Sequence, residues 1–375
     1  GSEMCIRDRV YSVPGMEYRL LFIAKGAGSA NKTALYQESR ALLGSAARLE
    51  EFLREKIGAI GVAACPPYRL SLVLGGSSPD LNLKTVKLAA AGWLDGLRTS
   101  HDPRGAAYRD LEWERKVLDL AAATGLGAQF GGRYLAVEAR VVRLPRHGGS
   151  FPVGLGVSCS ADRQILAKIN RRGVFLERLE RNPARMLKGR AWSGFSGVAV
   201  DLSRPPAETA ARLSAHPPGT ALKLSGPLIL ARDLAHARFA ELIAAGRNLP
   251  EYLYRYVVFY AGPAETPRGL PSGSLGPTTA QRMDGYAEDL LSRGASRIML
   301  GKGGRSAAAY QACRRHGGIY LATIGGAAAL IAREHVVASE VIDFPELGME
   351  AVRRVTVKDL PAFIIFNGRG RGFYD

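Results

Sequence analysis

Hydrophobic residues along this chain fall into short continuous runs and into longer stretches with a helical period. The run at residues 18–24 is almost wholly apolar and predicts a buried strand. From about Ser39 to Ile57, apolar residues recur at spacings of three and four, which predicts one amphipathic helix that ends at Gly58 and Gly61. Runs of the same two kinds predict strands at 68–74 and 134–144, a helix at 111–123, and a helix capped by Asp80 that runs to about Leu94.

The second half of the chain has shorter apolar runs, separated by glycine and proline. These runs predict three short strands, at 198–202, 221–224 and 228–230, and later helices at 280–293 and 306–316. Strands and helices are intermixed in both halves, and we find no internal repeat. The order of elements therefore predicts a mixed α/β fold.

The chain divides into two domains in this interpretation. Residues 1–10 do not match the rest of the chain and resemble a tag remnant and a translated sequencing adapter, so we exclude Cys5 from the chemistry. Glycine, proline and basic residues cluster at a boundary near the middle, which predicts a linker at 183–195. The first domain would span 11–182 and the second 196–375.

Composition sets broad limits on the class of protein. A length of 375 residues allows two domains with separate cores, and 47% hydrophobic with 23% charged residues is typical of a soluble globular protein. The longest weakly polar stretch, 321–332, is shorter than the ~20 residues that a membrane-spanning helix needs. Four cysteines do not make a disulfide scaffold, so we expect a reducing compartment, the cytoplasm, and no membrane partner.

The net charge of +17 raises the question of a nucleic-acid partner. Arginine dominates, with 40 Arg against 11 Lys, and these residues are scattered rather than concentrated in one run. Nucleic-acid binding would favour a concentrated basic face, often interleaved with aromatic residues. We therefore expect no nucleic-acid partner, and the excess positive charge is more consistent with small anionic substrates.

A glycine-rich turn comes directly after the first predicted strand. Residues 25–33 read Lys-Gly-Ala-Gly-Ser-Ala-Asn-Lys-Thr, and their backbone N–H groups could bind an anion at the start of the next helix. The segment is neither a P-loop nor a dinucleotide fingerprint, because Asn31 replaces the third glycine of the latter. By itself the segment is better explained as an ordinary tight turn than as a ligand-binding loop.

Cys65 and Cys159 each lie alone in a loop of small residues beside an apolar run. Single cysteines in proline- or serine-bearing loops suit thiolates that meet at one metal cluster from distant parts of a fold. The alternative is two unrelated buried thiols, since free cysteine is among the most buried residue types.

Several cationic and hydroxyl residues of the second half lie just after predicted strands. Arg232, Arg282 and Lys302 could converge on a substrate with two carboxylates, because the arginine fork matches carboxylate geometry. Thr278 is four residues before Arg282, so the two would share a face at a helix start. Taken one at a time, each cation is better explained as a surface charge or a helix cap. His147 could carry a proton or could be a structural group.

These stretches together resemble one family, the iron–sulfur-dependent (class I) fumarate hydratases in their single-chain form. The resemblance extends from about Tyr18 to the C-terminus. The strings that carry it, in the order of the family, are residues 21–33, Ala-Ala-Cys65-Pro-Pro-Tyr, residues 125–132, Arg-Leu-Pro-Arg-His147-Gly, Val-Ser-Cys159-Ser-Ala-Asp-Arg, Ala-Arg232-Asp-Leu-Ala-His, Gly-Pro-Thr278-Thr-Ala-Gln-Arg282-Met-Asp and Gly-Lys302-Gly.

The resemblance implies the reversible hydration of fumarate to (S)-malate, a step of the tricarboxylic acid cycle, at a [4Fe–4S] cluster. Three thiolates would hold the cluster, and its open iron would act as a Lewis acid. Cys65 and Cys159 match two of the three ligands, and Cys313 matches none and is expected to pack in the core. The fold implied is a mixed α/β cluster-bearing domain, followed by a β-rich swivelling β/β/α domain, with the active site between them in a homodimer.

The remaining site residues are also assigned by this resemblance. Thr278 matches the proton-abstracting residue, and His147 matches a histidine near the active site that assists proton exchange. Residues that match the substrate-binding groups are Gly28, Asn31, Lys32, Thr33, Gln37, Arg232, Thr278, Thr279, Arg282 and Lys302.

One departure from the family affects the expected activity. The family's N-terminal portion, which carries the third cluster cysteine, has no counterpart in this sequence, so we expect the chain to be a fragment with impaired activity. A related hydro-lyase, such as an L-tartrate dehydratase or a mesaconate hydratase, is the nearest alternative. A non-catalytic binding fragment is the alternative from another class.

Overall fold

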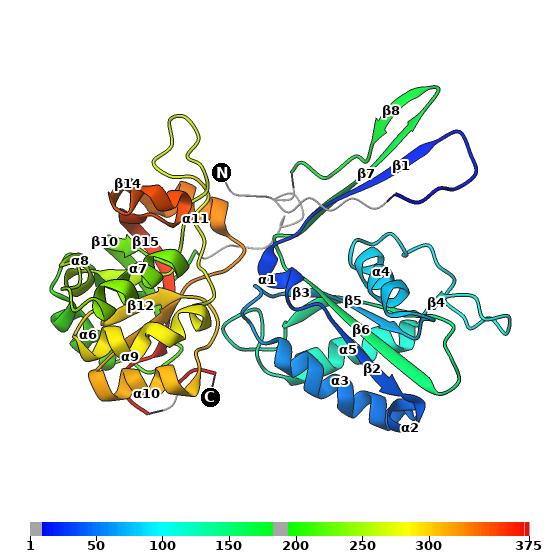
Figure 1. The fold of residues 1–375 in the computed structure, drawn as a ribbon, viewed down its shortest axis with the longest axis horizontal. Coiled ribbons are helices and arrows are strands. Elements are labelled where there is room, and N and C mark those ends of the chain that lie inside the picture. The colour runs from blue at the N-terminus through cyan, green and yellow to red at the C-terminus, as the bar shows by residue number, and fades with distance from the viewer. Residues whose placement is uncertain (1–9, 183–193, 371, 375) are drawn as a thin grey trace.

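A computed structural model describes residues 10–182, 194–370 and 372–374. The described residues form a mixed α/β structure built on three sheets, which confirms the predicted mixed α/β class (Figure 1). The predicted leader at 1–10 and linker at 183–195 lie almost entirely outside the described residues, as does Cys5. Among the described residues, no helix is both long and apolar enough to cross a membrane.

The first sheet is a small antiparallel arm of three strands in the order β1-β7-β8 (Figure 1). Its strands are β1 (Tyr18–Ala24), β7 (Arg163–Asn170) and β8 (Gly173–Leu176). The bounds of β1 agree with the predicted strand, but its predicted burial is wrong. Tyr18 is 75% exposed and Phe22 is 54% exposed, because β1 makes its main contacts with its sheet neighbour β7.

The second sheet has five strands in the order β2-β6-β3-β5-β4. They are β2 (Ala34–Ser39), β6 (Ser150–Ser158), β3 (Tyr68–Leu74), β5 (Ala136–Arg143) and β4 (Tyr108–Arg109). Successive strand residues point to opposite sides of a sheet, so apolar neighbours in one strand make both faces apolar. Helices cover both of these faces. Leu72 packs with α3 (Ala46–Ile60) and α5 (Leu111–Ala123), whereas Val73 packs with α4 (Pro79–Ala90).

The third sheet has seven strands and occupies the second half of the chain. In spatial order they are β14 (Val336–Asp343), β15 (Val352–Phe366), β13 (Ile319–Ala322), β12 (Ile298–Gly301), β11 (Val257–Phe259), β10 (Ala221–Leu230) and β9 (Val198–Asp201). The long strand β15 also pairs with β10, so one strand joins both sides of the sheet. Strands β9 to β13 run parallel to one another.

Helices connect and cover these strands. In the first half the remaining ones are α1 (Ala27–Ala30) and α2 (Arg40–Leu43). In the second half they are α6 (Pro206–Ser214), α7 (Asp233–Ala244), α8 (Tyr252–Arg255), η2 (Ala280–Tyr286), α9 (Ala287–Ser292), α10 (Ala307–His316), α11 (Ala328–His335) and η3 (Pro345–Glu350). Cys313, on α10, is fully buried in the core, as expected of a packing residue.

Helix predictions in the first half are correct in type and partly wrong in their ends. The helix predicted from Ser39 is two helices, because α2 ends at Leu43 and α3 begins only at Ala46. The Ser45 hydroxyl caps α3 by accepting a hydrogen bond from Arg48 N. Gly58 lies inside α3, and only Gly61 ends it. Ser78 rather than Asp80 caps α4.

Two further differences concern the second half. The strands predicted at 221–224 and 228–230 are one strand, β10, with a register shift between Leu224 and Gly226. The segment predicted as one helix at 280–293 is a 3₁₀ helix, η2, with α9 directly after it. In β10, the backbone hydrogen bonds of the strand continue through an interruption of the apolar pattern. At 280–293, the backbone hydrogen bonds change from the 3₁₀ pattern of η2 to the α-helical pattern of α9.

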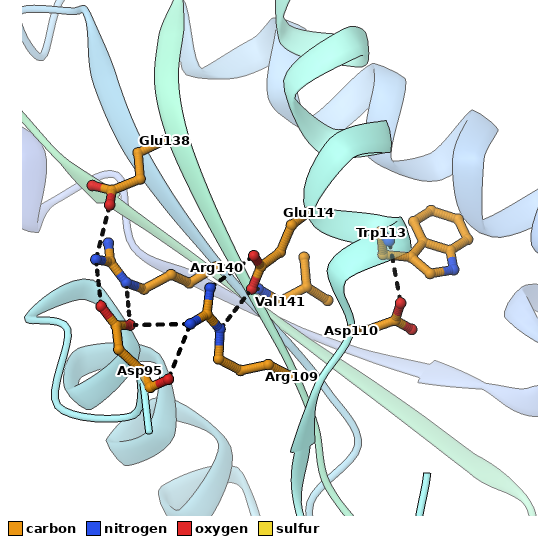
Figure 2. A network of polar contacts seen from close by, with 8 residues as sticks. All are labelled: Asp95, Arg109, Asp110, Trp113, Glu114, Glu138, Arg140 and Val141. Carbon is orange, nitrogen blue, oxygen red and sulfur yellow. Dashed lines mark hydrogen bonds and ion pairs between the residues drawn. The ribbon is translucent and has the colours of Figure 1, made fainter. Parts of the chain in front are cut away.

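A buried carboxylate ties α5 to the edge of the second sheet (Figure 2). Glu114 is only 9% exposed, and its oxygens accept hydrogen bonds from Arg109 Nε at 2.9 Å and Nη2 at 2.8 Å. The same side chain accepts a hydrogen bond from Val141 N at 3.2 Å. Arg140 pairs with Asp95 on the same edge. Arg109 and the Val141 amide satisfy the charge of the buried Glu114 carboxylate, which would otherwise be costly.

We predict that Gly154→Ala destabilises the protein, because β6 passes α4 at this glycine without room for a side chain. A Cβ there would lie 1.9 Å from Asn82 Oδ1, and Asn82 is itself held by hydrogen bonds to Val73 O and Gly75 O. Overpacking of this kind costs about 1–3 kcal/mol in the free energy of unfolding. The loss in free energy of unfolding is measured by urea unfolding of the wild type and the variant.

The matched control is Gly58→Ala on α3, where a Cβ would meet nothing within 4 Å. Alanine should stabilise this helix by roughly 0.5–1 kcal/mol. Equal effects of the two substitutions would contradict the packing argument.

Candidate functional site

Cys65 lies in the turn between α3 and β3 and is 7% exposed. Its φ of 64° is in the left-handed region, which a residue other than glycine adopts at a cost of about 1–2 kcal/mol. Lys302, in the turn after β12, reaches across from the second half, and its Nζ lies 2.7 Å from Cys65 Sγ. This contact joins residues 237 positions apart in the sequence.

Glycine turns of the second half pack directly against the Cys65 turn. A Cβ at Gly325 would lie 2.5 Å from Cys65 Sγ, and one at Gly303 would lie 3.2 Å from Ala63 Cα. The Thr279 hydroxyl donates to Ala63 O at 3.3 Å across the same junction. Because the glycines lack side chains, the two halves approach closely enough for Lys302 to reach the thiol.

Cys159 lies in the turn directly after β6 and is 6% exposed. Its Sγ donates to Asp162 Oδ1 at 3.2 Å, and the amide of the next residue, Ser160, donates to Cys65 O at 3.4 Å. The two cysteine turns therefore lie side by side. Burial, and after it the hydrogen bond to Asp162, raises the pKa of the Cys159 thiol above its usual range.

The described residues supply two thiols to this region, fewer than the three that a cluster with one open iron needs. Within residues 10–182, 194–370 and 372–374, no group of three or more His, Cys, Asp or Glu residues is arranged to hold a metal ion. The donor type suits iron, but the set is incomplete. No reaction step is therefore assigned to a cluster.

The glycine-rich loop lies against both of these features. A Cβ at Gly28 would lie 3.9 Å from Ala64 Cα and 3.9 Å from Lys302 Nζ, so this loop, the Cys65 turn and the lysine converge. Residues 27–30 form α1, and Asn31, Lys32 and Thr33 form the turn that leads from it into β2. Gln37 lies on β2 itself, opposite Pro152.

Thr278, Thr279 and Lys302 lie together on adjacent segments. Lys302 N donates to Thr278 O at 3.2 Å, and Ala280 N donates to Lys302 O at 3.0 Å, so the two segments form a short parallel bridge. Thr278 precedes η2 rather than lying within it, so the predicted shared helix face with Arg282 is not formed. Both threonine side chains are half-buried.

Arg232 and Arg282 share one carboxylate. Asp233 Oδ1 lies 2.8 Å from Arg282 Nε, and Asp233 Oδ2 lies 3.3 Å from Arg232 Nε. Arg232 Nη2 also pairs with Glu350 at 2.9 Å. Arg282 N donates to Thr279 O at 3.3 Å, so the arginine pair and the lysine are linked through η2.

His236, on α7, holds the backbone of Arg232. Its Nδ1 lies 2.9 Å from Arg232 O, and because a carbonyl only accepts, Nδ1 carries the proton and donates. Nε2 is buried without a hydrogen-bond partner among the described residues. Burial lowers the pKa of His236 to about 4, so the imidazole is neutral at pH 7.

The structure places His147 away from the thiols. It is exposed and precedes β6, whereas Cys159 comes after β6. Nine strand residues at about 3.3 Å each separate the two ends by roughly 30 Å. Its Nδ1 accepts a hydrogen bond from Gly149 N at 3.2 Å, which is a local turn contact.

Two residues of this region received no role from the sequence. The Gln129 amide donates to Pro66 O at 2.9 Å and to Gly325 O at 3.2 Å, and its oxygen accepts from Gly325 N at 2.7 Å. The Asp162 carboxylate contacts Cys159 and the glycine-rich loop. Both lie within the family strings, but neither shows a periodicity or spacing from which these distant contacts could be predicted.

The arrangement suits a small dianion. Two arginines and one lysine supply fork-shaped and point-like donors for carboxylates, and the lysine lies at the thiol turn. Thr278 and Thr279 lie on the segment whose backbone pairs with that of Lys302, and the Thr279 hydroxyl donates to Ala63 O.

We predict that His236 makes stability depend on pH between about 4 and 6.5. The folded protein keeps this histidine neutral, whereas the unfolded chain protonates it below pH 6.5, so stability is present above pH 6.5 and is lost as the pH falls toward 4. The loss between pH 7 and pH 5 should be roughly 2 kcal/mol.

The measurement is urea unfolding of the wild type and His236→Phe at both pH values. Phenylalanine fills the space among Phe239, Tyr260 and Tyr286 but does not titrate. The variant should lack this part of the pH dependence, and identical pH dependence in both proteins would refute the assignment.

Comparison with known proteins identifies related sequences along the whole chain. A family model described as "Fumarate hydratase (Fumerase)" matches residues 9–168, and one described as "Fumarase C-terminus" matches residues 173–375. The chain is 51% identical over 376 residues to "Fumarate hydratase class I, anaerobic" of Escherichia coli (strain K12), which covers 100% of this chain and 68% of that protein.

Relatives from other organisms extend this comparison. "Fumarate hydratase 2" of Leishmania major is 51% identical over 365 residues, which are 97% of this chain and 64% of that protein. A "Putative L(+)-tartrate dehydratase subunit beta" of Methanocaldococcus jannaschii is 30% identical over 161 residues, 42% of this chain and 83% of that protein. The chain thus spans about two thirds of the length of the fumarate hydratases it matches.

Proposed function

Because the chain belongs to the class I fumarate hydratase family, we propose that its site serves the reversible hydration of fumarate to (S)-malate. The reaction adds a hydroxyl group to one carbon of the double bond and a proton to the other. Substrate and product are both dicarboxylates, so the site must hold two negative charges in either direction.

The observation that carries this proposal is the contact of Lys302 Nζ with Cys65 Sγ at 2.7 Å. It places a cation of the second half beside a thiol of the first, with Gly28 of the glycine-rich loop next to both. A dicarboxylate bound by the lysine would therefore lie at the thiol turn, which is where the reaction of a family member would take place.

Roles for the other residues are proposed from their positions. Arg232 and Arg282 would bind a carboxylate by exchanging part of their contact with Asp233 and Glu350 for the substrate. Thr278, beside Lys302, would exchange the proton on carbon, and Thr279 would support the bound anion. Gly28, Asn31, Lys32 and Thr33 would line the side of the substrate site that belongs to the first half of the chain. Gln37, farther along β2, would contribute only to the outer part of that side.

The cofactor proposed is the [4Fe–4S] cluster of the family. Cys65 and Cys159 would provide two of its thiolates, and a third would have to come from outside the described residues. When bound, such a cluster supplies a Lewis-acidic iron. Further proposals are the division into a first domain at 11–182 and a second at 196–375, a homodimer, and a cytoplasmic location.

The proposal is tested by anaerobic reconstitution with iron and sulfide, and then by ultraviolet detection of fumarate formed from malate. Iron content should fall in Cys65→Ser and Cys159→Ser but not in Cys313→Ser, because Cys313 is a core residue of α10. Faster turnover of tartrate or of mesaconate than of malate would show that the substrate is one of these related compounds and not fumarate. Retention of iron by the double variant Cys65→Ser/Cys159→Ser would reject the cluster proposal.

We also predict that Lys302→Met weakens malate binding about tenfold or more, measured by titration calorimetry without a cluster. A charge-assisted hydrogen bond contributes about 1.5–3 kcal/mol, and 1.4 kcal/mol corresponds to a factor of about ten in the dissociation constant. The matched control is Lys358→Met, which removes an exposed lysine on β15. Equal malate affinities of the two variants would show that Lys302 does not contribute to malate binding.

A further inference from the structure

Asp162 is a buried carboxylate in the turn between β6 and β7. It is 4% exposed, although aspartate is rarely buried to this extent without partners. The turn leads directly from Cys159 into the arm strand β7, whose partner β1 leads into the glycine-rich loop (Figure 1). Asp162 therefore lies where the thiol turn and that loop meet.

One set of contacts of Asp162 lies within its own turn. Its Oδ2 accepts a hydrogen bond from Cys159 N at 3.1 Å, and its Oδ1 accepts one from Cys159 Sγ at 3.2 Å. A short side chain that bonds to backbone a few residues away is an ordinary way to fix a turn. These two contacts alone would make Asp162 a local structural residue.

The second set of contacts is not local. Oδ1 also accepts a hydrogen bond from Gly26 N at 3.1 Å, and the Ser29 hydroxyl lies 3.3 Å from Oδ1 and 3.2 Å from Oδ2. Ser29 is 1% exposed, and its hydroxyl also lies 3.0 Å from Gly26 O. The same carboxylate thus binds the thiol turn and the glycine-rich loop, although Gly26 is 136 and Ser29 is 133 residues away in the sequence.

Two arginines hold the backbone of the Asp162 turn. Arg69 Nη2 and Arg163 Nη1 donate to Asp162 O at 3.1 Å and 2.9 Å. Burial lowers the pKa of Lys25, at the start of the loop, and attraction to Asp162 opposes that shift. The carboxylate thus accepts from the loop and from its own turn, while the arginines fix the backbone of the same residue.

We propose that Asp162 is a positioning residue that fixes the glycine-rich loop of residues 25–33 against the Cys159 turn, so that loop and thiol keep one relative position. The geometry requires an acceptor at both oxygens, because the groups that face them are N–H, S–H and O–H donors. An isosteric amide would present an NH₂ group to these donors and lose part of the set. The part of the test that uses malate rests on the proposed function.

The test compares the full chain with Asp162→Asn by hydrogen–deuterium exchange and by thiol alkylation, each read by mass spectrometry. Exchange of amides 26–30 should become roughly tenfold faster, because opening of the loop no longer breaks the bond from Gly26 N. Alkylation of Cys159 should also become about tenfold faster. That of Cys313 should not change, since this thiol is buried in the core of the second half. If Asp162 fixed only its own turn, Asp162→Asn would speed alkylation of Cys159 without speeding exchange of the loop amides.

Two further variants keep the test decisive. Ser29→Ala removes one loop contact and should speed loop exchange several-fold, which provides a readout if Asp162→Asn does not fold. Asp110→Asn is the matched control, since Asp110 accepts a hydrogen bond from Trp113 N at the start of α5, away from the loop and the thiol. Its loop exchange should equal that of the wild type.

The outcomes separate this proposal from the proposed function. Unchanged exchange of residues 26–30 in Asp162→Asn and in Ser29→Ala would overturn the positioning role. Faster loop exchange together with weaker malate binding would support both proposals. Faster loop exchange with unchanged malate affinity would support the positioning role and exclude the loop from substrate binding.

Discussion

The whole site depends on the close approach of backbone turns from the second half to the Cys65 turn. Gly303 and Gly325 permit this approach, since a Cβ at Gly325 would lie only 2.5 Å from the Cys65 sulfur. Gln129 then binds both peptide groups that meet there, at Pro66 and at Gly325. Without this junction Lys302 would have no thiol to contact. Backbone packing therefore makes possible the electrostatics of the site.

Those electrostatics involve cations that already have carboxylate partners in the described chain. Arg282 has a side chain that is 54% exposed, and it shares Asp233 with Arg232. An exposed ion pair contributes little because water screens it, whereas two carboxylates of one ligand can engage both forks together. His236 holds the Arg232 carbonyl through Nδ1, and its burial keeps the imidazole neutral, so it adds no further positive charge beside the arginines. Arg282 is therefore the more weakly held of the two, whereas Arg232 pairs with Asp233 and Glu350, whose side chains are mostly buried.

The sequence predicted those parts of the fold whose neighbours in space are also neighbours in sequence. The bounds of β3 and α5 agree with the predicted strand and helix, because periodicity is a local property. The predicted burial of β1 was wrong for the opposite reason, since an apolar run does not specify what covers it. Cys65, Cys159 and Lys302 could be chosen by family resemblance. Gln129 and Asp162 could not be given roles, because their partners lie 196 and 136 residues away.

The two thiols differ in a way that gives Asp162 its importance. Cys65 faces the ammonium group of Lys302, whereas Cys159 faces a buried carboxylate that disfavours negative charge on its sulfur. A turn that served only to present a thiolate would not place an anion there. The same carboxylate, however, is the acceptor for Gly26 and Ser29, and removing it would release the loop that lies against Lys302. The unfavourable neighbour of Cys159 is therefore best understood as the consequence of fixing the loop and the thiol with one group.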